Sequence, residues 1–395
     1  MKNSTTEDFF VEQKTKSKIK TLIVSEFFKA YYSILDNAKQ LEKGFYYIDL
    51  FSGPGVYDDG SNSTPAVLLD IIDKSQTDIA EKIQMVFNDE KPEFYESLKT
   101  VVEKHTVYPR MRKKPVIFNK AANEVNVEKF LSNELPTFSF IDPWGYKDVS
   151  AEQIKWLVRT VGSDCILFFN VNRILQDLPK LTSKPHMEKI FGEKYLEACS
   201  LVENKCISQY QKGKIFVKLF SDNLYNQEFR DLKAKGYRLF VLPFEFKQDE
   251  NNKTSHYILF ISKNHTAIRE MKKIMVKISN SNTPELSYDD KNTLTFSLFS
   301  RDDDVKHNII ILITEMLKNH KKLLSVPKSI YEWYELIDSY YMKINYIVTP
   351  YTFKEFQESI ETMDENGMIC IHSEIKRKRI TQKSVISFSL NVLEN

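Results

Sequence analysis

A turn with two glycines follows the first apolar run of the chain, and an acidic residue stands just before it. The residues are Asp49-Leu50-Phe51-Ser52-Gly53-Pro54-Gly55. Glycine lets the backbone turn tightly and approach a ligand closely, and the amides that follow can face a carboxylate or a phosphate. The dinucleotide fingerprint has a third glycine where this chain has Asp58. The motif therefore predicts a different ligand-binding turn, and the alternative is a β-turn without a ligand.

Two more polar residues end apolar runs. Asp89 closes the run 83–89, and Asn119 closes the run 115–119. An acid in the position of Asp89 commonly accepts hydrogen bonds from the two ribose hydroxyls of an adenosyl cofactor. Its distance from Asp49 exceeds the usual ~20 residues, which an extra loop at 57–67 explains. We expect Asn119 to meet the adenine on its position alone; the alternative for Asp89 is a solvated helix N-terminus.

The motif with the most information is Asp142-Pro143-Trp144-Gly145-Tyr146, after the apolar run 137–141. Amino-group methyltransferases have Asp or Asn, two prolines and an aromatic residue at this point. A carboxylate and a backbone carbonyl accept the two hydrogens of an amine and aim its lone pair, while an aromatic ring stacks on the base. Asp142 and the Pro143 carbonyl fit the first task, and Trp144 or Tyr146 fits the second. The second proline is missing, so an Asp-Pro turn with a core tryptophan is the alternative.

These motifs need a sheet that brings their positions together. Five nearly continuous apolar runs, each typical of a parallel strand buried on both faces, alternate with helical patterns. They are 45–51, 83–89, 115–119, 137–144 and 164–171. The runs 236–246 and 256–263 flank a polar turn and predict an antiparallel pair. Parallel strands closed by such a pair predict an α/β, Rossmann-like class I methyltransferase fold for residues 45–280.

Three segments lie outside that core. Residues 1–44 predict a helical leader, and about 174–235 predict a helical insertion. Residues 281–395 contain helical patterns followed by two short strands, which predicts a winged-helix domain. Its basic tip, Lys376, Arg377, Lys378 and Arg379, is the candidate nucleic-acid contact, with a solvated turn as the alternative.

Composition narrows the class of protein. The chain has 395 residues and a net charge of +2, which excludes a histone-like basic binder. No apolar run spans a bilayer and no signal peptide is visible, so we expect a cytoplasmic protein without membrane contact. The four cysteines form no CxxC pair, and no metal site is expected.

Taken together, the ordered motifs resemble the three-Cys-motif partner proteins, a bacterial and phage-associated family with a methyltransferase-like domain. The resemblance runs from the leader through YIDLFSGPG and FIDPWGY to HYILFISKNHTAIREMKKIM and the C-terminal helices. The family usually has Asp-Pro-Phe-Gly, so Trp144 is an aromatic exchange. The resemblance implies a separate partner polypeptide whose three-cysteine motif is of the iron–sulfur type.

Two functions remain open at this point. The first is an S-adenosylmethionine-dependent methyltransferase acting on nucleic acid, DNA in preference to RNA, in phage defence or a mobile element. Its candidate cofactor contacts are Asp49, Phe51, Gly53, Gly55, Asp89 and Asn119. The second is a non-catalytic scaffold that binds DNA or a protein partner through the winged helix, a role favoured by the atypical motif at Asp142.

Overall fold

The computed structural model describes residues 6–57, 59–131, 134–248, 253–280, 284–289, 301–372 and 380–393. The chain divides into two compact units. The first comprises Met1–Ile278 with Ser287–Lys291, and the second comprises Ser279–Leu286 with Asn292–Asn395. Within the described ranges, no helix combines the length and the apolar character needed to cross a bilayer.

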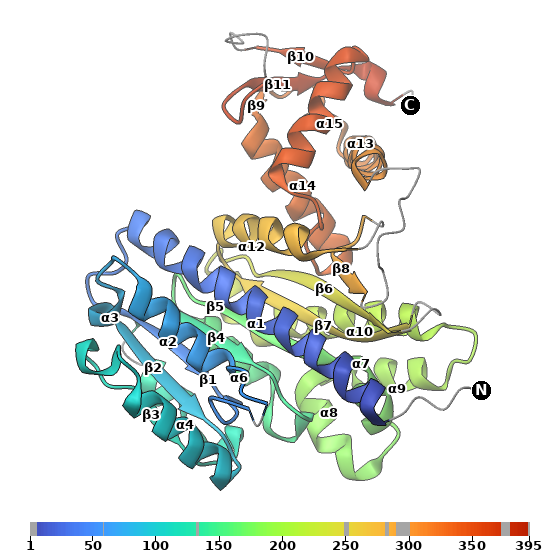
Figure 1. Ribbon diagram of the computed structural model, residues 1–395. Coiled ribbons are helices and arrows are strands. Elements are labelled where there is room, and N and C mark those ends of the chain that lie inside the picture. The colour runs from blue at the N-terminus through green and yellow to red at the C-terminus, as the bar shows by residue number, and fades with distance from the viewer. Residues whose placement is uncertain are drawn as a thin grey trace. The chain divides into compact units, whose positions relative to one another are not determined.

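The first unit is built on one eight-stranded sheet in the order β3-β2-β1-β4-β5-β7-β6-β8 (Figure 1). The strands are β1 (Phe45–Asp49), β2 (Ile83–Asn88), β3 (Val116–Phe118), β4 (Thr137–Ile141), β5 (Asp164–Asn170), β6 (Phe240–Gln248), β7 (Lys253–Ser262) and β8 (Ser287–Asp289). Strands β1 to β5 are parallel, while β7 runs antiparallel to both β5 and β6. The five predicted parallel strands and the antiparallel pair are confirmed. The short parallel strand β8 was not predicted.

Helices flank and extend this sheet. They are α1 (Thr6–Asn37), α2 (Thr64–Lys74), α3 (Ile79–Lys82), α4 (Pro92–Lys104), α5 (Val127–Leu131), α6 (Ala151–Val158), α7 (Val171–Asp177), α8 (Lys184–Phe191), α9 (Tyr195–Glu203), α10 (Gln209–Asn223), α11 (Arg230–Ala234) and α12 (His265–Ile278). Helix α6 begins where Ser150 accepts a hydrogen bond from the Gln153 amide at 3.0 Å, which confirms the predicted N-cap. Helices α7 to α11 occupy the predicted insertion.

The leader helix α1 is part of the first unit and lies between α2 and α12 (Figure 1). Phe27, Phe28 and Tyr31 on its inner face are fully buried. The Phe27 ring lies 5.3 Å from that of Phe138 on β4, and the Phe28 ring lies 6.0 Å from that of Tyr47 on β1. Each buried aromatic side chain contributes ~1.5–3 kcal/mol, so this cluster fixes α1 against the sheet.

The second unit has its own core. Its elements are α13 (Arg301–Asn319), β9 (Lys328–Ser329), α14 (Ile330–Asn345), α15 (Phe353–Glu365), β10 (Ile369–Ile371) and β11 (Val385–Phe388). The strands form an antiparallel sheet in the order β10-β11-β9. Trp333 of α14 is fully buried, and its Nε1 donates a hydrogen bond to the Ile386 carbonyl at 3.2 Å. Gly367 follows α15 with a φ of +66°, as a helix C-terminal glycine does.

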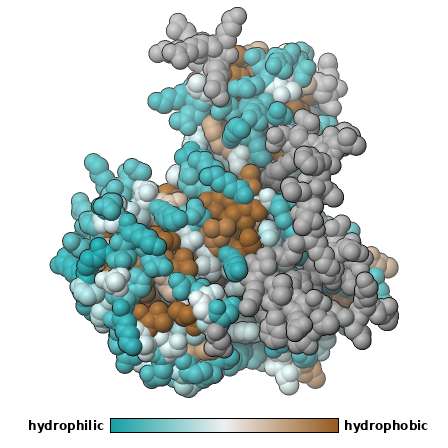
Figure 2. Space-filling view, viewed as in Figure 1, coloured by the Kyte–Doolittle hydropathy of each residue, from teal (hydrophilic) through white to brown (hydrophobic). Residues whose placement is uncertain are grey.

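The exposed surface is mainly polar. Figure 2 shows hydrophilic residues over most of the visible face, with apolar residues gathered in separate patches between them. Single exposed apolar side chains are normal on a folded chain, so none of these patches by itself indicates a function.

Candidate active site

The carboxyl ends of β1, β2 and β4 open into a cleft of about 1510 Å³. Strand β1 lies between β2 and β4, so residues that end these three strands meet at one edge of the sheet. The residues that line the cleft include Phe51, Gly53, Asp89, Asp142, Pro143, Trp144 and Tyr146. The fold therefore brings together two motifs that lie far apart in the sequence.

The glycine turn has the backbone that its sequence predicts. Gly53 and Gly55 have φ angles of +69° and +83°, in the left-handed region that disfavours side chains. A Cβ on Gly55 would lie 3.1 Å from the Val101 side chain of α4, so this turn packs directly on that helix. A Cβ on Gly53 would meet only the Tyr57 hydroxyl, at 3.6 Å. Gly53 thus leaves its backbone approachable from the cleft.

Asp89 holds the glycine turn. Its Oδ2 accepts a hydrogen bond from the Gly53 amide at 2.9 Å, and its Oδ1 accepts one from the Lys91 amide at 3.0 Å. Each carboxylate oxygen carries a second lone pair, so hydroxyl groups of a ligand can still donate to Asp89. Asn119 is exposed and donates through Nδ2 to the carbonyls of Asp89 and Glu90 at 2.9 and 3.0 Å. In this structure Asn119 shapes the turn after β2.

Asp49 is buried below the turn. It is only 1% exposed, and its Oδ1 accepts a hydrogen bond from the Phe51 amide at 3.0 Å. Its Oδ2 makes no hydrogen bond of regular geometry with any described residue. Burial raises the pKa of Asp49 to about 8; the Phe51 amide opposes this rise, and the charges of Asp142 and Asp89 add to it. A cationic ligand group beside Oδ2 would supply the missing partner.

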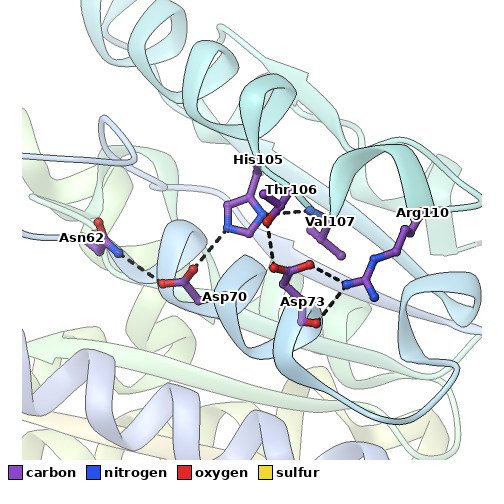
Figure 3. Close-up of polar contacts among 7 residues, drawn as sticks. All are labelled: Asn62, Asp70, Asp73, His105, Thr106, Val107 and Arg110. Carbon is purple, nitrogen blue, oxygen red and sulfur yellow. Dashed lines mark hydrogen bonds and ion pairs between the residues drawn. The ribbon is translucent and has the colours of Figure 1, made fainter.

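A polar cluster braces the far side of the turn (Figure 3). Asp70 of α2 accepts a hydrogen bond from Asn62 at 3.4 Å and lies 3.3 Å from Nε2 of His105. Asp73, one turn further along α2, accepts hydrogen bonds from Thr106 at 2.7 Å and Arg110 at 2.5 Å. These contacts tie the glycine loop to α2 and to the segment after α4, which gives the cluster a structural role.

Asp142 has a partner that sequence reasoning missed. Its Oδ2 lies 2.5 Å from Nζ of Lys20, on α1, and the two side chains are 23% and 16% exposed. The same Nζ lies 4.2 Å from the centroid of the Phe168 ring, at the end of β5. Helical spacing was the available signal, because Lys20 lies on the same face of α1 as the buried residues Val24, Phe27 and Tyr31.

The two aromatic residues after Asp142 have different environments. Trp144 is 78% exposed, so the alternative of a core tryptophan is wrong. Tyr146 is only 2% exposed, and its hydroxyl accepts a hydrogen bond from the Asn170 amide at 2.6 Å. Burial raises the pKa of Tyr146 far above its ordinary value. Its ring is therefore packed where it cannot stack on a base, and of the two rings only Trp144 is presented to solvent.

The wall beyond Lys20 also escaped the sequence analysis. His256 of β7 is 7% exposed and stacks on Phe246, with ring centroids 4.4 Å apart. Its Nδ1 lies 2.7 Å from Oγ of Ser255, and that hydroxyl lies 3.1 Å from the Phe246 carbonyl. Burial lowers the pKa of His256 well below its ordinary value, and the charges of Lys20 and Lys16 lower it further. The imidazole is therefore neutral.

The predicted nucleic-acid contacts Lys376, Arg377, Lys378 and Arg379 lie outside the described residues.

No family model matches the sequence, and no curated protein matches it. Solved structures provide matches at low identity. Protein LPL1258 from Legionella pneumophila is 11% identical, over 66% of this chain and 90% of that one, with a TM-score of 0.33. The methyltransferase domain of bacterial CtHen1-C is 11% identical, over 61% and 98%, with a TM-score of 0.29. YjhP from E. coli is 12% identical, over 62% and 99%, with a TM-score of 0.25.

The strand order supplies the classification. Five parallel strands are followed by β7, which inserts antiparallel between β5 and β6. A dinucleotide-binding sheet normally stays parallel to its last strand, whereas this reversed strand is the mark of the class I methyltransferases. The first unit of this chain has a class I methyltransferase fold.

Proposed function

We propose that this chain is an S-adenosylmethionine-dependent methyltransferase that acts on nucleic acid, most directly on the amino group of a base. The observation that carries the proposal is one cleft that joins the glycine turn above buried Asp49 to the carboxylate of Asp142. In open α/β sheets, ligands bind at this edge, where the strand order reverses.

The residues on the cofactor side fit a ligand of this kind. Asp49 has an Oδ2 without a regular hydrogen bond among the described residues, and the cofactor carries a cationic amino group that would donate to it. The open face of Gly53 leaves room for the methionine end, Phe51 lines the same cleft, and Gly55 holds the turn against α4. Asp89 would accept the ribose hydroxyls, with Asn119 fixing its turn. When bound, the cofactor supplies a methyl group on a positively charged sulfur.

The residues on the acceptor side would orient an amine. Asp142 and the carbonyl of Pro143 would accept its two hydrogens, which keeps the nitrogen lone pair available and directs it toward the methyl group. Trp144 would stack on the base, and its 78% exposure supports this role. The ammonium of Lys91 lies 5.9 Å from the Trp144 ring centroid, where it can also attract a nearby phosphate. Tyr146 would act from below, by fixing the end of β5.

The second unit supports nucleic acid as the substrate. Its order of helix, strand, two helices and two strands, with one antiparallel sheet, is the order of a winged helix. On this assignment the segment between β10 and β11 is the wing, and it contains Lys376, Arg377, Lys378 and Arg379. We propose that it contacts DNA rather than RNA. Membership of the three-Cys-motif partner family, an iron–sulfur partner and a role in phage defence belong to the same proposal.

The decisive experiment measures cofactor binding and methyl transfer separately. Calorimetry on the full chain should detect S-adenosylhomocysteine, and Asp89→Ala should weaken its binding by ~1–3 kcal/mol because the variant cannot accept hydrogen bonds from the ribose. Glu93→Ala, an exposed acid on α4 that does not line the cleft, is the control. Asp142→Asn should reduce transfer of labelled methyl to DNA by ~100-fold while cofactor affinity changes little.

The competing function is a scaffold that keeps the fold without the reaction. The single proline after Asp142 favours it. A wild-type protein that binds no cofactor at millimolar concentration would establish the scaffold and refute the enzyme.

A further inference from the structure

We propose that the ammonium of Lys20 occupies the place of the acceptor amine, so that a substrate amine must displace Lys20 from Asp142 before it can be methylated. This inference rests on the proposed function, because it takes Asp142 as the acceptor-binding carboxylate. It makes Lys20 a specificity-determining residue contributed by the leader helix.

The contacts of Lys20 are those that an acceptor amine needs. Its Nζ donates to Oδ2 of Asp142 at 2.5 Å and lies 4.2 Å from the centroid of the Phe168 ring. A base amine bound for methylation would likewise donate a hydrogen to Asp142 while its ring system lies against an aromatic side chain. An ammonium and a substrate amine cannot occupy this position together. Lys20 is therefore an intramolecular competitor for the acceptor site.

The helix that carries Lys20 is held in place, so the side chain itself must move. Phe27, Phe28 and Tyr31 are buried against β1 and β4 and lie two to three turns after Lys20 along α1. Lysine has a flexible four-carbon stem, and its ammonium can leave Asp142 without displacement of the helix. The release has a cost, because the pair is mostly buried and each charge loses its partner.

Among the residues that the structure describes, the wall around Lys20 offers no second anion to the ammonium. Phe168 lies beneath it, and the Phe168 ring lies 4.3 Å from that of His256. The Ser255 hydroxyl donates to the Phe246 carbonyl and so accepts from Nδ1 of His256. This assignment of hydrogens leaves a neutral imidazole next to Lys20. Asp142 is thus the group that holds Lys20 in position.

A binding experiment separates competition from a contribution to binding. The probes are cytidine, which has an exocyclic amine, and uridine, which has a carbonyl in its place, each titrated with S-adenosylhomocysteine at saturation. Lys20→Met keeps the apolar stem and removes the competing charge, so cytidine should bind roughly tenfold more tightly than to the wild type. Uridine affinity should not change. Lys20→Arg keeps a cation opposite Asp142 and should resemble the wild type.

The control is Lys29→Met, which removes an exposed positive charge from the same helix. It should leave cytidine affinity unchanged. Methylation of Lys20 itself, detected by peptide mass spectrometry after incubation with S-adenosylmethionine, would also support the proposal because it requires Nζ at the acceptor position.

Two results would overturn the inference. One is equal cytidine affinity in Lys20→Met and wild type, and the other is weaker cytidine binding by the variant. In both cases intact binding of S-adenosylhomocysteine would show that the proposed function survives. Loss of that binding from the wild type would instead refute the proposed function itself.

Discussion

Asp49 gives the sharpest test of the site, because its function and its contribution to stability have opposite signs. The perturbation is Asp49→Asn, which keeps the shape and an oxygen for the Phe51 amide but cannot ionise. Burial raises the pKa of Asp49 from 3.8 to about 8 in the folded protein. A carboxyl group with a raised folded-state pKa stabilises the folded form fully below its unfolded pKa, and this contribution is lost as pH rises toward 8.

The size of the effect follows from the same shift. One pKa unit corresponds to ~1.4 kcal/mol, so at pH 7 the unfavourable burial of Asp49 is on the order of 4 kcal/mol relative to an ordinary carboxyl group. Asp49→Asn removes this cost. The free energy of unfolding of the variant should therefore exceed that of the wild type, and the excess should grow by ~3 kcal/mol between pH 5.5 and 7.5.

Urea titrations at several pH values measure this difference, with Glu93→Gln as the control for loss of an exposed acid. The reasoning about Asp49 would be refuted by an excess that stays constant across that pH range.

The same residue couples cofactor binding to pH. A cationic amino group beside Asp49 favours the ionised carboxylate, so at pH 7 binding should release a proton. Affinity for S-adenosylhomocysteine should then rise by ~10-fold per pH unit between pH 6 and about 8. Calorimetry in two buffers of different ionisation enthalpy counts the proton. Asp49→Asn should lose both the affinity and its pH dependence, and a wild type with no proton release would contradict this role.

Three further predictions concern the turn, the exposed ring and the wing. Gly55→Ala should lower stability by ~1 kcal/mol more than Gly60→Ala in thermal unfolding, since both have positive φ but only Gly55 faces a side chain, that of Val101 at 3.1 Å; equal losses would argue against close packing there. Trp144→Ala should weaken acceptor binding by ~1–3 kcal/mol with little change in melting temperature, as expected for a ring that is 78% exposed, and a large loss of stability would indicate a structural role. Neutralising residues 376–379 should flatten the salt dependence of DNA binding by roughly one unit of slope for each phosphate that the wing no longer neutralises, and an unchanged slope would assign the wing to a protein partner.

Local sequence patterns determined the strands of the sheet and the positions of the site motifs. A parallel strand buried on both faces requires a continuous apolar run, and a polar residue marks the point where the chain emerges, as at Asp49, Asn88 and Asp142. The N-cap at Ser150 was equally readable, because it depends on neighbours within one helical turn.

Other elements carried weaker local signals. Helix α14 is rich in aromatic and β-branched residues, which mask its helical pattern, although the capping box of Ser329 and Glu332 marks its start. Strand β8 has only three residues and exists because β6 offers it an edge for pairing. Neither could be found from periodicity, since tertiary contacts outweigh local propensity in such segments.

Tertiary structure alone decided the chemistry of the site. Lys20 and Asp142 are 122 positions apart, and they pair because aromatic residues fix α1 over β4. The exposure of Trp144 and the burial of Tyr146 differ although the two residues are neighbours in one motif. The raised pKa of Asp49 comes from its burial beneath the turn that its own motif forms. The sequence determined which groups are present, whereas their charges and partners depend on burial and on distances that only the folded chain defines.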